Sequence, residues 1–198
     1  MTKNSVLGVL LLLVCVASGC ASSASKYPYY AREYDPRKHP YVIGVSDVLE
    51  VNVWKDESLS TEARVRPDGT ITVPLVGEVR AAGRTTDALR EEIRQRLTQY
   101  VKQAVVTVAV GEVNSYNFTV AGNVGQPGVY SSRRFVTVSE AIALAGGPNR
   151  YATAKEVEII RTESAKQRRI PIDYDAILEG DRPEMDIAVL AGDTVYVP

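Results

Sequence analysis

Short segments with apolar residues at every second position recur along the chain. In VLEVNVW (residues 48–54), Leu49, Val51 and Val53 alternate with other residues, and YNFTVAGNV (116–124) alternates in the same way. A period of two places one side of a segment against a core and the other in water, as in a half-buried strand. Two segments show helical spacing instead, so the pattern predicts an α+β fold.

The first group of segments predicts a strand, a hairpin, a helix and a closing strand. Residues 63–79 alternate on both sides of Pro67-Asp68-Gly69, a turn sequence, and Pro74 limits the second arm because proline cannot donate to a ladder. Residues 85–103 predict an amphipathic helix, and AVVTVAV (104–110) predicts a buried strand. The apolar stripe of that helix consists of Leu89, Ile93, Leu97 and Val101.

The second group predicts the order β-β-α-β-β-β, which fits a β-grasp arrangement. After the strand at 116–124, Gln126-Pro127-Gly128 predicts a turn into a pairing strand, GVYSS. Thr137 and Glu140 form a capping-box sequence ahead of a short apolar helix, which Gly146-Gly147-Pro148 ends. The remaining strand candidates are EVEIIRTE (156–163), RRIPID (168–173) and the end of LAGDTVYVP (190–198).

The first 19 residues have the layout of a secretory signal peptide. Lys3 precedes an apolar run of 12 residues from Val6 to Ala17, which is too short to span a bilayer comfortably. Ala17-Ser18-Gly19-Cys20 resembles a bacterial lipobox, which predicts lipid attachment at Cys20 after removal of residues 1–19. The alternative is an ordinary signal peptide with a chance cysteine. Residues 20–40 are then the lipidated N-terminus and a tether.

The tyrosines of the tether allow two interpretations. Tyr27, Tyr29 and Tyr30 could stack on sugar rings or lie at a membrane surface, because their rings are amphipathic. Docking of these side chains on the neighbouring domain is the favoured interpretation.

The residue inventory argues against an enzyme. No cysteine follows Cys20, and His39 is the one histidine, so no disulfide within the folded body, thiolate metal site or histidine cluster is expected. The carboxylate pairs Asp47/Glu50 and Asp173/Asp175 are weak evidence for glycosidase chemistry. Gly146-Gly147 lacks the Lys and Ser/Thr of a phosphate loop. A net charge of −1 argues against nucleic acid. We expect no catalytic residue, cofactor or metal.

These segments together resemble a known family. Residues 41–112 resemble the polysaccharide-export domain of Wza-type outer-membrane lipoproteins, through YVIGVSDVLEVNVW, VRPDGTITVPLVGEVRAAG and the helix before AVVTVAV. Residues 113–198 resemble the SLBB β-grasp domain that follows in that family, through VAGNVGQPGVY, TVSEAIALAGG and LAGDTVYVP. The ordered succession is specific, whereas each piece alone would be weak.

The resemblance implies a non-enzymatic component of an exopolysaccharide or capsule export machine. Family members form closed homo-oligomeric rings and work with an inner-membrane polysaccharide co-polymerase, often coupled to a tyrosine kinase. This implies a protein held at the outer membrane by a lipid and facing the periplasm of a Gram-negative bacterium. Ala21 agrees, because an aspartate there would suggest retention at the inner membrane.

Two departures from the family pattern qualify this expectation. Val45-Ser46 stands where the family has Pro-Gly, which alters a turn. The sequence ends at Pro198, without the second β-grasp domain and the C-terminal amphipathic helix of Wza-like members. We therefore expect a short form, a lipid-anchored periplasmic ring or collar around the path of the polysaccharide, with a separate outer-membrane β-barrel as the exit.

Two other functions remain as alternatives. One is a monomeric periplasmic lipoprotein that binds a glycan or another ligand, and the other is a periplasmic carbohydrate-active enzyme. Within the export interpretation, Asp47 and Asp68 are the residues of interest, and both are expected to be mainly structural, beside a strand and in a tight turn.

Overall fold

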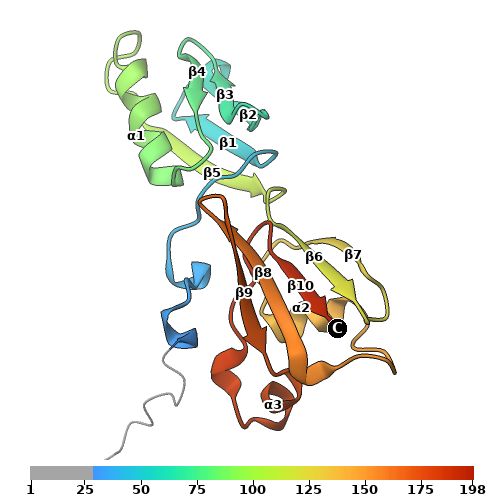
Figure 1. The fold of residues 1–198 in the computed structure, drawn as a ribbon. Coiled ribbons are helices and arrows are strands. Elements are labelled where there is room, and N and C mark those ends of the chain that lie inside the picture. The colour runs from blue at the N-terminus through green and yellow to red at the C-terminus, as the bar shows by residue number, and fades with distance from the viewer. Residues whose placement is uncertain (1–28) are drawn as a thin grey trace, which may run out of the picture.

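The computed structural model describes residues 29–198, which form two lobes joined end to end (Figure 1). Each lobe has its own cluster of buried apolar side chains. The chain passes from the first lobe to the second through residues 113–115. The predicted leader, Cys20 and Tyr27 lie outside the described residues.

The first lobe combines two small sheets with one helix. A three-stranded antiparallel sheet has the order β2-β1-β5, and β3 pairs with β4 in a separate hairpin. The elements are β1 (Val48–Val53), β2 (Thr61–Arg64), β3 (Thr70–Val73), β4 (Gly77–Arg80), α1 (Thr86–Leu97) and β5 (Val106–Glu112). Helix α1 packs against β5 (Figure 1).

Helix α1 is shorter than its apolar stripe predicts. Leu89, Ile93 and Leu97 are fully buried, as expected, and the Thr85 side chain caps the N-terminus by accepting a hydrogen bond from an amide of the first turn. The helix ends at Leu97, and Val101 is only partly buried. The sequence beyond, Thr-Gln-Tyr-Val, is rich in weak helix formers, so little favours another turn.

The prediction of a hairpin across Pro67-Asp68-Gly69 was wrong about which strands pair. The tight turn does form, with Gly69 at φ +81° and its amide donating to the Arg66 carbonyl at 2.8 Å. However, β2 takes β1 as its ladder partner, and β3 pairs with β4 across the turn that follows Pro74. Proline ends β3 as expected, and the chain then reverses with Leu75 at φ +61°.

Strand β5 is also less buried than expected. It lies at an edge of its sheet, with β1 on one side. Its residue Val106 is buried, whereas Thr107 and Ala109 are exposed. An apolar sequence alone does not distinguish a strand covered on both faces from an edge strand covered on one face.

The second lobe is a five-stranded mixed sheet with the order β7-β6-β10-β8-β9. Its elements are β6 (Asn117–Gly122), β7 (Gly128–Ser131), α2 (Val138–Leu144), β8 (Val157–Glu163), β9 (Lys166–Ile172), α3 (Tyr174–Glu179) and β10 (Thr194–Val197). The last strand inserts between the two hairpins, parallel to β6 and antiparallel to β8. This parallel central pair with a helix after the first hairpin is the expected β-grasp arrangement, so the α+β class is confirmed.

Local signals placed α2 correctly and missed α3. The capping box is present, because the Glu140 amide donates to Thr137 Oγ1 and the Thr137 amide donates to Glu140 Oε2. Gly147, at φ +76°, ends the helix with its amide on the Ile142 carbonyl. Helix α3 has six residues, capped by Asp173 and ended by Gly180, which is too short to show a helical period.

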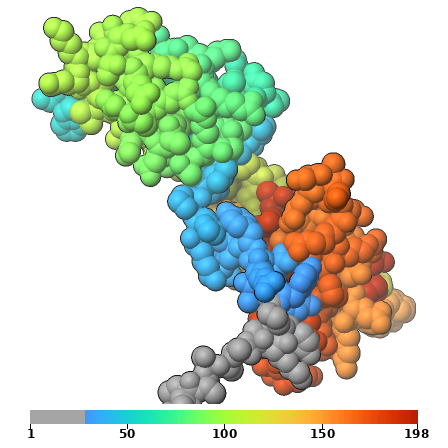
Figure 2. All heavy atoms as spheres, turned by 60° about the vertical axis from the view of Figure 1, so that its left-hand side comes forward, coloured from blue at the N-terminus to red at the C-terminus, as the bar shows by residue number. Residues whose placement is uncertain are grey.

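Residues 29–40, which we expected to be tether, lie against the second lobe. We call this segment the N-terminal strap; it contains the 3-10 turns Tyr30–Arg32 and Pro36–Lys38. Figure 2 shows it, in blue, covering part of the second lobe. Tyr30 is only 7% exposed and belongs to the second apolar core, so docking, the favoured interpretation of this tyrosine, is correct.

Candidate functional site at the joint between the lobes

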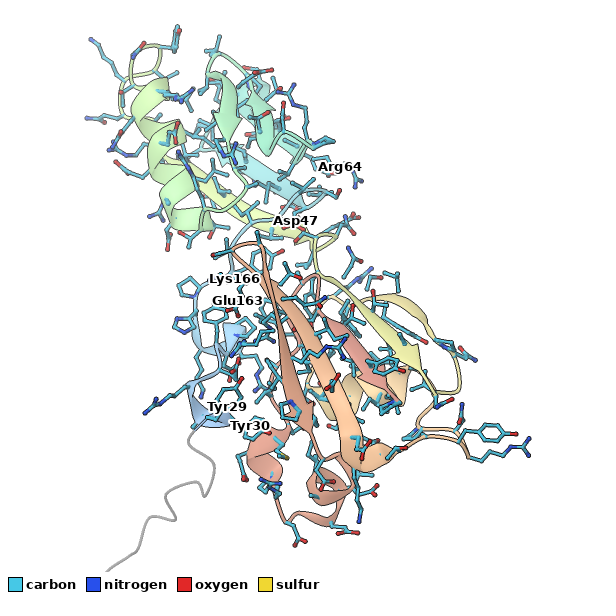
Figure 3. All side chains as sticks on the ribbon, in the orientation of Figure 1. Tyr29, Tyr30, Asp47, Arg64, Glu163 and Lys166 are labelled. Atoms are coloured by element: carbon cyan, nitrogen blue, oxygen red, sulfur yellow. The ribbon has the colours of Figure 1, made fainter. Side chains whose placement is uncertain are left out.

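A single buried carboxylate organises the joint. Asp47 is 0% exposed and lies where the two lobes meet (Figure 3). Its Oδ2 accepts hydrogen bonds from the Tyr41 hydroxyl at 2.6 Å and the Gly44 amide at 2.8 Å. Its Oδ1 accepts from the amides of Asn114 at 2.9 Å and Ser115 at 2.8 Å. The carboxylate therefore ties the chain entering the first lobe to the chain leaving it.

The electrostatics of the joint fix two protonation states. Burial alone raises the pKa of Asp47, but hydrogen bonds from Tyr41 and three backbone amides outweigh it, so the pKa lies below its usual value. Burial and the neighbouring carboxylate raise the pKa of Tyr41 far above its usual value. Asp47 is thus ionised and Tyr41 neutral near pH 7, as suits a structural contact.

Close packing makes the joint stiff. A Cβ added at Gly44 would overlap the side chain of Ser115 in the linker, so only glycine fits between the two segments. The Tyr41 hydroxyl also lies 3.1 Å from Ser115 Oγ. Hydrogen bonds and steric contact therefore hold the same point of the linker, and both restrict rotation of one lobe relative to the other.

A cleft of about 250 Å³ opens beside this joint. Its walls come from the strap, the start of the first lobe and the second lobe, and they are mainly aromatic and apolar. The principal side chains are Tyr34, Pro40, Tyr41, Tyr116 and Phe135. Among residues 29–198, the side chains that line this cleft include no carboxylate and no histidine, and its rings offer surfaces for stacking.

A second buried cluster lies within the second lobe, and we call it the arginine cluster. It consists of Glu33, Arg161, Arg168 and Asp193. Arg161 donates from Nε and Nη2 to the Asp193 carboxylate, with a shortest distance of 2.7 Å, and from Nη1 to Glu33 Oε2 at 3.1 Å. Arg168 donates twice to Glu33, at 2.7 Å each. The side chains of Glu33, Arg161 and Asp193 are at most 6% exposed.

The structure does not assemble the carboxylate pairs singled out in the sequence into an active site. Asp47 is buried, whereas Glu50 is exposed on β1. Asp173 accepts a hydrogen bond from an amide of α3 at 3.0 Å and acts as its cap. Asp68 accepts from the amide and hydroxyl of the residue two positions on, as expected of a turn aspartate. His39 stacks on Tyr34, with ring centroids 4.9 Å apart.

Neither a membrane-spanning helix nor a metal-binding cluster is found among residues 29–198. No helix in that range is long and apolar enough to cross a membrane. The same residues contain no group of three or more His, Cys, Asp or Glu side chains that could hold a metal ion.

Sequence reasoning missed the arginine cluster, although one signal was visible. In β8, Val157, Ile159 and Arg161 share the inward face, so the strand period alone places an arginine in the core. A buried arginine requires a carboxylate partner. The period does not say which carboxylate it is, because Glu33 and Asp193 are 128 and 32 residues away in the chain.

The fold defines a class of protein: an α+β lobe with a short helix, followed by a β-grasp lobe. Comparison with family models agrees with this division. Residues 35–111 match the polysaccharide biosynthesis/export protein model, and residues 117–173 match the SLBB domain model. The chain belongs to the polysaccharide biosynthesis/export family of the Wza type.

Curated relatives carry names that agree with the family. The chain is 30% identical over 152 residues to the EPS I polysaccharide export outer membrane protein EpsA of Ralstonia solanacearum, covering 65% of this chain and 40% of the relative. It is 26% identical over 175 residues to the capsule polysaccharide export protein BexD of Haemophilus influenzae, covering 77% and 42%. The chain thus spans less than half the length of these relatives.

Proposed function

We propose that this protein is a non-enzymatic component of an exopolysaccharide or capsule export machine. The observation that supports this most is the ordered succession of an export-type lobe and an SLBB lobe, together with relatives named as polysaccharide export proteins. The chemistry of the joint fits this function, because its ionisable groups are held by hydrogen bonds for structure. The task is to guide a long hydrophilic polymer, and this requires no covalent bond to be formed or broken.

The stiff joint supports a ring or collar as the working form. In a closed cyclic oligomer each subunit contacts two neighbours through head-to-tail interfaces, so an error in subunit shape is repeated at every interface. Asp47 and Gly44 restrict the angle between the lobes and thereby the shape of each subunit. We propose a ring held by a lipid on Cys20 at the outer membrane, facing the periplasm, and working with an inner-membrane polysaccharide co-polymerase.

The lipid anchor gives the first prediction. In a strain that lacks the gene and any paralogue, the wild-type chain should restore surface polysaccharide. Cys20→Ser should yield a folded protein that is found in the soluble periplasmic fraction and restores export poorly, because two or more acyl chains are needed for lasting attachment. Cys15→Ala, which changes the other cysteine of the leader, should restore export fully. Surface polysaccharide and membrane fractionation are the two measurements.

Two outcomes would contradict this proposal. If surface polysaccharide is unchanged in the deletion strain, the protein has no necessary role in export. If Cys20→Ser stays in the membrane fraction, the anchor is a different part of the chain.

The cleft beside the joint supports a second candidate, a monomeric glycan-binding lipoprotein. Its tyrosine and phenylalanine rings could stack on sugar rings.

The size of the protein in mild detergent separates the two candidates and is the second prediction. The export proposal predicts a stable assembly several times larger than one chain of 21.6 kDa. A monomer that binds oligosaccharides, with affinity lost in Tyr34→Ala, would favour the second candidate instead.

A further inference from the structure

The N-terminal strap is fastened to the second lobe by buried contacts. The Tyr30 hydroxyl donates to the Pro171 carbonyl at 2.6 Å, near the end of β9. Further along the strap, the Glu33 carboxylate takes two hydrogen bonds from Arg168 and one from Arg161. The strap therefore runs along β9 in the opposite direction to that strand.

The second lobe depends on the strap for the pairing of Arg161. This guanidinium is 3% exposed in its side chain, and it faces Asp193 on one side and Glu33 on the other. It also donates a hydrogen bond to the Ala188 carbonyl, at 3.1 Å. Glu33 thus supplies one of two counter-charges to a buried arginine. Removing one partner of a buried ion pair destabilises a fold more than removing one partner of a surface ion pair.

The direction of the strap places its start at one end of the molecule. The first 3-10 turn, Tyr30–Arg32, contacts the turn Pro183–Met185 near α3. In Figure 3, Tyr29 and Tyr30 lie far from Asp47, at the side of the second lobe remote from the joint. The strap then follows the second lobe toward the joint, where Tyr41 contacts Asp47. A force applied upstream of Tyr29 therefore acts on the remote side of the second lobe.

We propose that the Glu33 contact with Arg161 and Arg168 fixes the lipid-anchored end of the chain to the second lobe. This contact would hold the α3 end toward a phospholipid surface and direct the first lobe away from it. This rests on the proposed lipid at Cys20. Tyr29 lies nine positions after Cys20, and a fully extended chain over those nine steps spans about 30 Å. The α3 end consequently stays within reach of the surface, and Glu33 is a positioning residue.

The test compares energy transfer from the two ends of the lipidated full chain. The protein is reconstituted in phosphatidylethanolamine/phosphatidylglycerol vesicles that contain a headgroup-labelled acceptor lipid. A donor dye is attached to a single new cysteine, either Glu179→Cys at the end of α3 or Lys102→Cys in the exposed loop after α1. We expect strong transfer from position 179 and weak transfer from position 102. Equal transfer from both positions would overturn the proposed orientation.

Variants of Glu33 test whether this contact sets the orientation. Glu33→Ala should remove most of the difference between the two positions. It should also speed hydrogen exchange of the Arg32 and Glu33 amides, which close the first turn of the strap, by about tenfold or more, as expected when charge-assisted hydrogen bonds are lost. Unchanged transfer and exchange would refute the role of Glu33.

Matched variants keep the result interpretable. Glu163→Gln removes a carboxylate that also contacts Arg168, at 3.2 Å, but lies outside the strap and is 57% exposed, so it should behave as wild type. Arg168→Gln removes two bonds to Glu33 and leaves the buried pair of Arg161 and Asp193 in place, so it should loosen the strap even if Glu33→Ala folds poorly.

The proposal and the lipid anchor can fail separately. Hydrogen exchange of the strap is also measured in Cys20→Ser, in which no lipid can be attached at this residue. Suppose that the wild-type chain does not bind vesicles, but Glu33→Ala still speeds hydrogen exchange of the strap in the Cys20→Ser background. The proposed lipid anchor is then wrong, and the proposed strap contact is correct. If the chain binds vesicles and the strap exchanges equally fast with and without Glu33, the strap contact is wrong.

Discussion

Asp193→Ala is expected to lower the free energy of unfolding of the second lobe by about 3–5 kcal/mol, the range observed when one partner of a buried ion pair is removed. Asp193 is 2% exposed and takes three hydrogen bonds from Arg161. It also accepts from the Leu190 amide at 2.7 Å, which closes the turn before β10. The substitution leaves a buried guanidinium with one counter-charge and opens that turn.

The measurement has to resolve the two lobes, because they have separate cores and need not unfold together. Native-state hydrogen exchange at the amides of β8 and β10 reports the second lobe, and exchange in β1 reports the first. Asp181→Ala is the matched control, because Asp181 is an exposed aspartate near α3, and its effect should stay within about 0.5 kcal/mol. A loss below about 1 kcal/mol for Asp193→Ala would mean that Glu33 alone satisfies Arg161.

Asp47→Ala is expected to cost about 2–4 kcal/mol and to loosen the joint. It removes the acceptor of four hydrogen bonds at a fully buried position, and each buried group left without a partner costs about 1–3 kcal/mol. Hydrogen exchange of the Asn114 and Ser115 amides should rise more than exchange in the core of either lobe. Small-angle X-ray scattering should show a wider range of lobe separations.

The effect of Asp47 should depend on pH in a definite direction. The folded-state pKa of this carboxyl lies below its usual value, so the ionised form stabilises the fold. That stabilisation is complete above the unfolded value of about 4 and is lost as the pH falls through the lower folded value. The difference in stability between the wild type and Asp47→Ala should therefore be constant from pH 5 to about 7 and shrink below pH 4.

Asp68→Asn provides the control for Asp47. Asp68 is exposed and stabilises a local turn, so its substitution should change stability far less than Asp47→Ala does and should leave the joint unaffected. If Asp47→Ala leaves the Asn114 and Ser115 amides as protected as in the wild type, the joint is held by packing alone, with Gly44 against Ser115 as its main contact.

Signals within a few residues of each other predicted most of the elements. Alternation identified β1 and β6, the strand candidates at 156–163 and 190–198 correspond to β8 and β10, and the capping box with its terminal glycines gave α2 almost to the residue. These signals work because they reflect hydrogen bonds made inside one turn or one strand. Two errors concern partners, namely the ladder partner of β2 and the open face of β5. The end of α1 at Leu97 was missed for a local reason, because weak helix formers follow it.

For the candidate site, too, the sequence predicted local contacts but not contacts between distant residues. The sequence was sufficient to single out Asp47, and to give Asp68 its role in a turn, because a turn aspartate bonds its own backbone. It also supplied the order of lobes that carries the family assignment. It could not show that Asp47 receives amides from residues 114 and 115, or that Glu33 reaches Arg161 across 128 positions. Those contacts exist only after the lobes and the strap have packed, because burial brings distant charges together and then requires them to be paired.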